Sequence, residues 1–138
     1  MPKFGRRSKR RLNGVDGRLI EVLNEVVKYF DITVIEGLRS EARQMELLAK
    51  GKSKTKFSKH LTGKAVDIAP YPIDWKSRDD FHYLGGFVLG IAAKMGVNVR
   101  WGGDWSSPSL DKNVMAGSEQ RTTKDNGFDD LVHFELID

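Results

Sequence analysis

The sequence predicts a small α+β domain. Three stretches carry the apolar spacing or the good helix formers that amphipathic helices need, at 15–30, 40–50 and 77–95. Short runs rich in β-branched and aromatic residues are typical of strands, at 32–35, 65–69, 97–101 and 131–137. A chain of 138 residues is long enough to bury about two thirds of its extended surface in one domain.

Capping and stop signals set the boundaries of two of these helices. Ser40 is a suitable N-cap for the second helix, and Gly51 is a natural residue to follow its end. Ser77 and Asp80 have the spacing of a capping box at the start of the third helix, which we expect to end at Gly96. The first and third helices have apolar stripes that predict core packing.

Two predicted strands place polar side chains on one face of the sheet. Because side chains alternate along a strand, Asp67 points away from its apolar neighbours Val66 and Ile68. In the last strand, His133 and Glu135 share the face opposite the apolar residues. The pattern predicts that these polar side chains lie together on one face of the sheet, while the other face is apolar.

The basic residues are concentrated in two places. The formal net charge is +4 and the sequence pI is about 9.4, and the excess gathers in segments 1–14 and 50–59. A solvated surface, attraction to acidic cell-wall material and a nucleic-acid arm all remain open. The nucleic-acid interpretation is weaker because no aromatic residues alternate with these basic residues, as a base-stacking platform requires.

No stretch is apolar and long enough to cross a bilayer, and the basic N-terminus lacks the apolar core of a signal peptide. We therefore expect synthesis in the cytoplasm without an export signal, and no stable insertion into a membrane.

The segment 58–67 predicts part of a metal site. It contains His60 and Asp67 around a glycine turn, and an ion such as zinc accepts both kinds of ligand. The chain has no cysteine, so further ligands must be His, Asp or Glu. His82 falls in a helical pattern, whereas His133 lies in a strand on the polar face. We predict zinc bound by His60, Asp67 and His133.

These residues resemble a known family. The pattern Ser-x-His-x-x-Gly-x-Ala-x-Asp at 58–67 and the pattern Asp-x-x-His-x-Glu at 130–135 are similar to those of zinc peptidases related to D-alanyl-D-alanine carboxypeptidases. Segments 4–8, 37–40 and 102–105 resemble further motifs of phage endolysins that act as L-alanyl-D-glutamate peptidases. Several separated motifs in one order are more specific than any single one.

The resemblance implies a fold and an activity. The fold is a mainly antiparallel sheet with helices on one face and the zinc cleft on the other, in a single catalytic domain over 1–138 without a separate wall-binding domain. The activity is cleavage of the L-alanyl-D-glutamate bond in bacterial peptidoglycan, which lyses the host. The protein would act as a monomer, bind no nucleic acid, and leave the host cytoplasm through a holin.

The resemblance also implies roles for individual residues. Amide hydrolysis needs a base for the attacking water, and Asp130 has the spacing to His133 that this role requires in the family. Asp129 is the second candidate. The resemblance implies that Arg39 binds the substrate. Ser58 is a further candidate, either to stabilise the negative charge that develops on the carbonyl oxygen or to orient its own loop.

Several alternatives and roles remain open from the sequence. A D-alanyl-D-alanine carboxypeptidase or dipeptidase has similar metal motifs, and a non-enzymatic zinc protein or a basic nucleic-acid-binding protein belongs to another class. The roles of Asp104, Trp105 and Glu135 are undecided. The long polar segment 106–127 is expected to border the active site, since loops of that length are usually functional or disordered.

Overall fold

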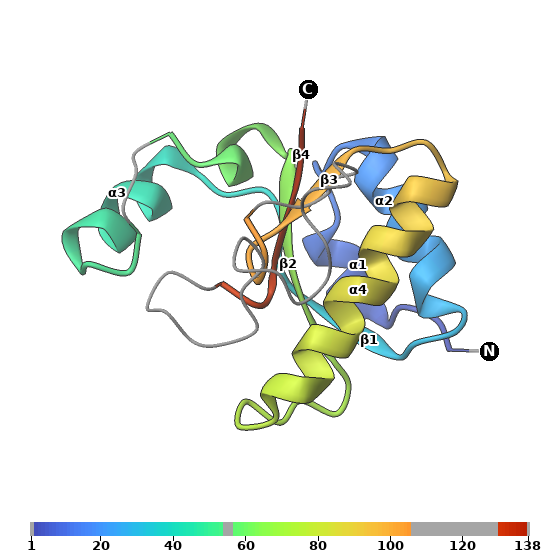
Figure 1. Ribbon diagram of the computed structural model, residues 1–138. Coiled ribbons are helices and arrows are strands. Elements are labelled where there is room, and N and C mark those ends of the chain that lie inside the picture. The colour runs from blue at the N-terminus through green and yellow to red at the C-terminus, as the bar shows by residue number, and fades with distance from the viewer. Residues whose placement is uncertain (1, 54–56, 106–129, 138) are drawn as a thin grey trace.

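A four-stranded antiparallel sheet forms the centre of the molecule (Figure 1). The computed structural model describes residues 2–53, 57–105 and 130–137. The strands lie in the order β1-β2-β4-β3, with β1 at Ile32–Glu36, β2 at Ala65–Pro70, β3 at Val99–Trp101 and β4 at His133–Leu136. All three strand pairs are antiparallel, so the predicted α+β fold with a mainly antiparallel sheet is confirmed.

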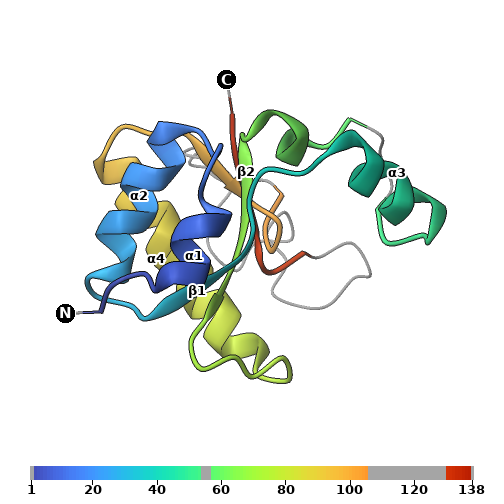
Figure 2. The same cartoon turned by 180° about the vertical axis from the view of Figure 1, so that it is seen from behind.

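The helices lie unequally on the two sides of the sheet. Figures 1 and 2 show α1, α2 and α4 on one side, while α3 lies on the other. The bounds are α1 at Arg6–Arg11, α2 at Gly17–Val27, α3 at Glu41–Ala49, the 3-10 helix η1 at Lys59–Thr62, and α4 at Arg78–Lys94. The three helices expected from the sequence are present, each somewhat shorter than its pattern.

The short helix α1 is not predicted by its sequence, because its residues are nearly all basic and carry no apolar stripe. It is held instead by contacts with β1. The Oγ atom of Ser8 accepts a hydrogen bond from the backbone N–H of Val34 at 3.0 Å, and Arg11 Nη1 donates to the Val34 carbonyl at 2.8 Å. Tertiary hydrogen bonds therefore fix this helix against the edge of the sheet.

The hydrophobic core lies between the sheet and α2 and α4. One face of β2 and β4 contributes fully buried side chains to it, which are Val66, Ile68, Phe134 and Leu136. The helices supply the facing side chains, which include Leu19, Val22, Leu23, Val26, Leu84 and Val88. This packing makes the sheet a rigid support, and it leaves the opposite face of the same strands for polar groups.

Two predicted helix starts have different outcomes. The Ser40 side chain accepts a hydrogen bond from the Arg43 N–H at 3.1 Å and caps α3 as expected. The predicted capping box at α4 is wrong, because the Ser77 side chain makes no capping hydrogen bond. Its backbone carbonyl accepts from the Asp80 N–H at 3.2 Å instead, so a backbone turn replaces the side-chain cap.

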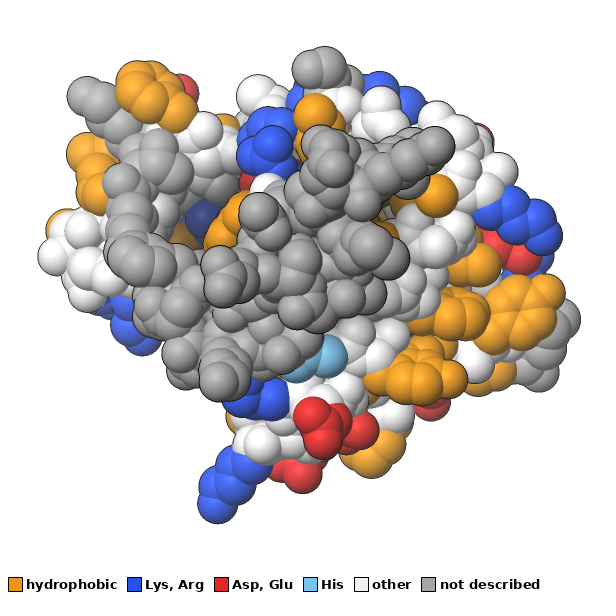
Figure 3. Space-filling model, viewed as in Figure 1, with side chains coloured by type: hydrophobic (Ala, Val, Ile, Leu, Met, Phe, Trp, Pro, Cys, Tyr) orange, Lys and Arg blue, Asp and Glu red, His pale blue; other side chains and the backbone are white. Residues whose placement is uncertain are grey.

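The surface carries apolar side chains as well as charged ones. On the face seen in Figure 3, hydrophobic side chains gather at the lower right, on the side where Figure 1 draws α4. Among the described residues, no helix has the length and hydropathy needed to cross a membrane.

Candidate metal centre

His60, Asp67 and His133 meet on the polar face of the sheet. Asp67 and His133 are direct partners in the antiparallel pairing of β2 with β4, so both side chains project from the same face. Each of the three residues offers a ligand atom, and these atoms all lie within 4.8 Å of one another. The sequence pattern thus predicts a group that the fold brings together.

The 3-10 helix η1 carries His60 over this face. Ser58 caps the helix by accepting a hydrogen bond from the His60 N–H at 3.2 Å. Gly63 ends it with a φ of 73°, and a Cβ atom there would lie 2.2 Å from the carbonyl oxygen of Gly14. A side chain is excluded at this turn both by the left-handed backbone and by the close approach. The His60 side chain is only 2% exposed.

Both histidine rings are oriented by acceptors outside the cluster. His60 Nδ1 donates to the carbonyl oxygen of Gly37 at 2.8 Å, which turns Nε2 toward Asp67 Oδ1 at 3.1 Å. His133 Nε2 lies 2.9 Å from Glu135 Oε1, which turns Nδ1 toward the same Asp67 oxygen at 3.2 Å. Metal-binding histidines characteristically donate their second ring N–H to a carbonyl or carboxylate in this way. The residues therefore fit a metal ion.

The charges in the cluster support one another. Burial alone would raise the pKa of Asp67, but hydrogen bonds from His133 and His60 outweigh it and hold that pKa far below its usual value. Burial opposes protonation of His133, yet its hydrogen bonds to Asp67 and Glu135 raise its pKa to about 9. A metal ion that binds this cluster would therefore compete with a proton on His133.

Glu135 belongs to this arrangement as the outer partner of His133. Burial alone would raise the pKa of its carboxyl group, but the hydrogen bonds and positive charges of His133 and Lys59 together lower that pKa. Lys59 Nζ adds a second positive partner at 3.2 Å from Glu135 Oε2, and it also donates to the Leu136 carbonyl. Glu135 lies two residues after His133 and therefore on the same face of the strand. That spacing is the sequence signal for its contact with the His133 ring.

Asp130 lies at the entrance to β4, held by its backbone. Its N–H donates to the Gly102 carbonyl at 2.9 Å, and the Gly102 N–H donates to the His133 carbonyl at 2.8 Å. A Cβ atom on Gly102 would lie 2.3 Å from the Asp130 carbonyl oxygen, so this contact requires glycine. Solvent reaches Asp130, yet the protein atoms around it and the negative charge of Asp67 together raise its pKa.

Arg39 is tied to protein groups at the edge of the site. Its Nε and Nη2 contact the two oxygens of Glu36 at 2.7 and 2.8 Å, and its Nη1 donates to Gln44 at 2.7 Å. Donation of these hydrogen bonds to Glu36 raises the pKa of Arg39, and the charges of Asp67 and Asp130 act in the same direction. Three of its five N–H groups are thus engaged, and its guanidinium has a fixed position near both carboxylates.

The other residues considered from the sequence lie at varying distances from the cluster. The ring of Trp105 lies 5.8 Å from that of His133, beside the cluster. Asp104 is buried next to the turn after β3. His82 packs edge-on against Trp101 in the core, away from the three ligands, as its helical pattern suggests. Asp129 and the segment 106–127 lie outside the residues that the structure describes.

Sequence reasoning about metal ligands misses the outer contacts made through the backbone. Gly37 and Gly102 make these contacts with backbone groups and have no side chain that would indicate them. Their only sequence signal is that they lie in the motifs at 37–40 and 102–105. Two imidazole nitrogens and one carboxylate oxygen are a combination found in catalytic zinc sites, which keep a further position for water or substrate.

Known proteins match this chain over nearly its whole length. A solved structure, the L-Ala D-Glu endopeptidase ChiX of Serratia marcescens, superposes with a TM-score of 0.75 and 31% identity, covering 99% of this chain and 91% of its own. The L-alanyl-D-glutamate peptidase of Escherichia phage T5 is 30% identical over 138 residues, 94% of this chain and 98% of that protein. The profile of phage L-alanyl-D-glutamate peptidases matches residues 1–137. This chain belongs to the phage L-alanyl-D-glutamate peptidase family.

Proposed function

We propose that this protein is a zinc-dependent peptidoglycan hydrolase of the endolysin type, which cleaves the amide bond between L-alanine and D-glutamate in the stem peptide. The observation that carries the proposal is the convergence of His60, Asp67 and His133 with both rings oriented by outer acceptors. Membership of the peptidase family supports the choice of bond.

Zinc is the proposed metal because two imidazole nitrogens and one carboxylate oxygen suit a borderline-soft ion, and no thiolate is present. When bound, zinc supplies a Lewis acid that polarises the peptide carbonyl and makes water more acidic.

Asp130 is proposed as the general base. Its carboxyl group lies near Asp67 and has a raised pKa, which brings it closer to the range in which a carboxylate can take a proton from water and return it as an acid. The hydrogen bond from the Asp130 N–H to the Gly102 carbonyl fixes the backbone of Asp130, so only the side-chain torsions decide where its carboxyl group points. Proton transfer to the leaving amine completes the cleavage.

Arg39 and Ser58 are proposed to support the substrate in different ways. Arg39 has two N–H groups beyond those that Glu36 and Gln44 engage, and they suit a carbonyl or carboxylate oxygen of the peptide. Ser58 contributes indirectly, because its Oγ accepts from the His60 N–H and so caps the 3-10 helix that positions His60.

The proposed setting follows the family. The chain acts as one catalytic domain and as a monomer on peptidoglycan, without a role for nucleic acid. It is made in the host cytoplasm and reaches the wall after a holin opens the membrane.

The test is digestion of purified peptidoglycan followed by mass spectrometry of the new ends. Cleavage at the proposed bond creates an N-terminal D-glutamate and a C-terminal L-alanine, and it should stop when zinc is removed and resume when zinc is restored. Release of free D-alanine would indicate a carboxypeptidase instead. Undigested wall with zinc-replete protein would contradict both.

A further inference from the structure

We propose that a pocket between the N-terminal segment, α1 and α2 is a second binding site for the wall polymer, and that it takes an acidic stem peptide while another is at the metal centre. This inference rests on the proposed function, because peptidoglycan is the polymer that the enzyme meets there.

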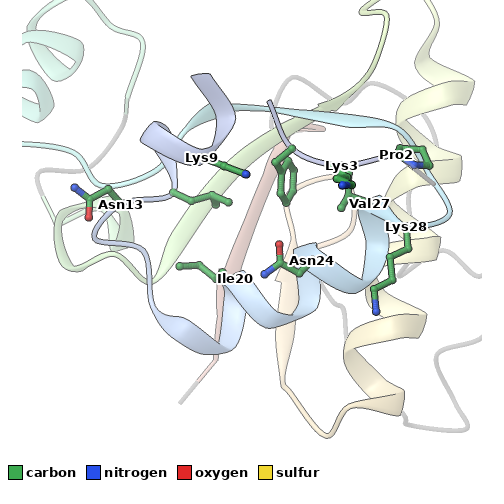
Figure 4. Close-up of a pocket in the computed structure, with 10 residues that line it drawn as sticks. Pro2, Lys3, Lys9, Asn13, Ile20, Asn24, Val27 and Lys28 are labelled. Carbon is green, nitrogen blue, oxygen red and sulfur yellow. The ribbon is translucent and has the colours of Figure 1, made fainter. Parts of the chain in front are cut away.

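The pocket has the size and lining of a ligand site. Its volume is about 700 Å³, within the range of about 300–1,000 Å³ that is usual for small-molecule sites. Its apolar lining comes from Phe4, Leu12, Ile20 and Val27. Figure 4 shows Lys9 extending from α1 and Asn24 rising from α2 toward the same space.

The positive charge of the protein is concentrated in the N-terminal segment that forms one wall of this pocket. Segment 1–14 holds six of the 23 Lys and Arg residues and none of the 19 Asp and Glu residues, so the rest of the chain has a formal charge of −2. Lys3 and Lys9 line the pocket and are exposed, and neither has an ion pair among the described residues. Lys28, also in the lining, pairs with Glu25 at 2.9 Å. Two amines are therefore available to an anion.

The polar groups of the lining favour a peptide over a hydrocarbon tail. Asn13 and Asn24 each offer an amide that both donates and accepts hydrogen bonds. A peptide backbone satisfies such groups, whereas an acyl chain would remove them from water without replacing their hydrogen bonds. A stem peptide also brings carboxylates for Lys3 and Lys9, and methyl and methylene groups for the apolar lining.

The position of the pocket allows both sites to act together. Its lining comes from the N-terminal segment, α1 and α2, and Figure 1 shows both helices on one side of the sheet. The metal cluster lies on the face of β2 and β4 opposite the one that packs against α2 and α4. A ligand in the pocket therefore does not obstruct the cleavage site. Two attachments to one polymer raise the effective concentration of neighbouring stem peptides at the metal centre.

A binding experiment tests the site directly. The probe is a mixture of soluble muropeptides, released from peptidoglycan by a muramidase, added to isotope-labelled Asp130→Asn protein, which is expected to cleave them at least about 10²-fold more slowly. We expect amide signals of α1 and α2 near Lys9 and Asn24 to shift together with signals around the metal centre. Adding Lys9→Glu should abolish only the first group of shifts. Lys94→Glu, an equal charge change on α4 outside the pocket, should leave both groups intact.

An activity measurement gives a second readout. In the otherwise unaltered enzyme, Lys9→Glu and Asn24→Leu should each slow the solubilisation of intact wall about tenfold relative to hydrolysis of a short soluble peptide, because only the polymer can occupy both sites. Thermal unfolding of each variant controls for folding.

The proposal is overturned if muropeptides shift no signals of α1 and α2, or if Lys94→Glu slows wall digestion as much as Lys9→Glu. It is also overturned if vesicles containing phosphatidylglycerol shift those signals and muropeptides do not, which would make the pocket a lipid site. Failure of the proposed function differs from these results, because the L-alanyl-D-glutamate bond would then stay intact in both substrates while muropeptides still bind the pocket.

Discussion

Glu135 Oε1 lies 2.9 Å from Nε2 of His133, on the side of the ring opposite Asp67. The carboxylate thereby selects which ring nitrogen faces the cluster, and Lys59 in turn holds the carboxylate. Such outer contacts fix the orientation of a ligand and strengthen it as a donor.

Removing this contact should weaken metal binding without unfolding the protein. Glu135→Ala is expected to lower zinc affinity about 10- to 100-fold, because the His133 ring loses its fixed orientation. Glu135→Gln should recover part of the loss, since its amide oxygen still accepts from Nε2. Competition with a chromogenic chelator measures the affinity. Equal affinity in Glu135→Ala and the unaltered protein would show that the contact does not position the ring.

The ligand set predicts about one zinc ion per chain. His133→Ala should lose that ion, because two ligands do not hold zinc at a catalytic site. His82→Ala is the matched control, since His82 packs against Trp101 away from the cluster, and it should retain the metal. Elemental analysis of metal-replete protein gives the stoichiometry. Unchanged zinc in His133→Ala would remove His133 from the ligand set.

Asp130→Asn should separate proton transfer from metal binding. The amide keeps the size of the side chain but cannot accept the proton of water, so turnover should fall about 10²-fold or more while zinc stays bound. Zinc content and the rate of peptide hydrolysis are measured on the same sample.

The comparison variant for this prediction is Asp129→Asn. It should have a mild effect, because the proposed mechanism assigns the proton transfer to Asp130 alone. If Asp129→Asn is inactive and Asp130→Asn is active, the base is the earlier residue. If both are active, neither carboxylate is the base.

Gly102→Ala should disturb the site through the backbone. Its Cβ atom would lie 2.3 Å from the Asp130 carbonyl oxygen, and relieving that collision must move the turn that leads to His133. We expect a loss of about 1–3 kcal/mol in the free energy of unfolding, together with reduced activity. Chemical denaturation measures the first quantity.

Gly86→Ala is the matched control for Gly102→Ala. Gly86 is exposed in α4 and a Cβ atom there meets nothing within 4 Å, so alanine should stabilise the helix by about 0.5–1 kcal/mol. A similar response of the two variants would mean that the contact between Gly102 and Asp130 is not rigid.

The sequence by itself predicted the three longer helices, the four strands and the three candidate metal ligands. Alternation along a strand fixed the common face of His133 and Glu135, and apolar spacing fixed which sides of the helices enter the core. These properties are local, because they follow from the repeat of one helix or strand. The family resemblance rested on motifs of the same local kind.

Tertiary structure alone decided what depends on distant groups. The helix α1 exists because Ser8 and Arg11 bond to Val34, and the free nitrogen of His60 is set by the Gly37 carbonyl. Backbone donors and acceptors are the same in every residue, so their partners leave little trace in a sequence pattern. Strand order and the packing of helices supplied those partners, and with them the orientation of the site.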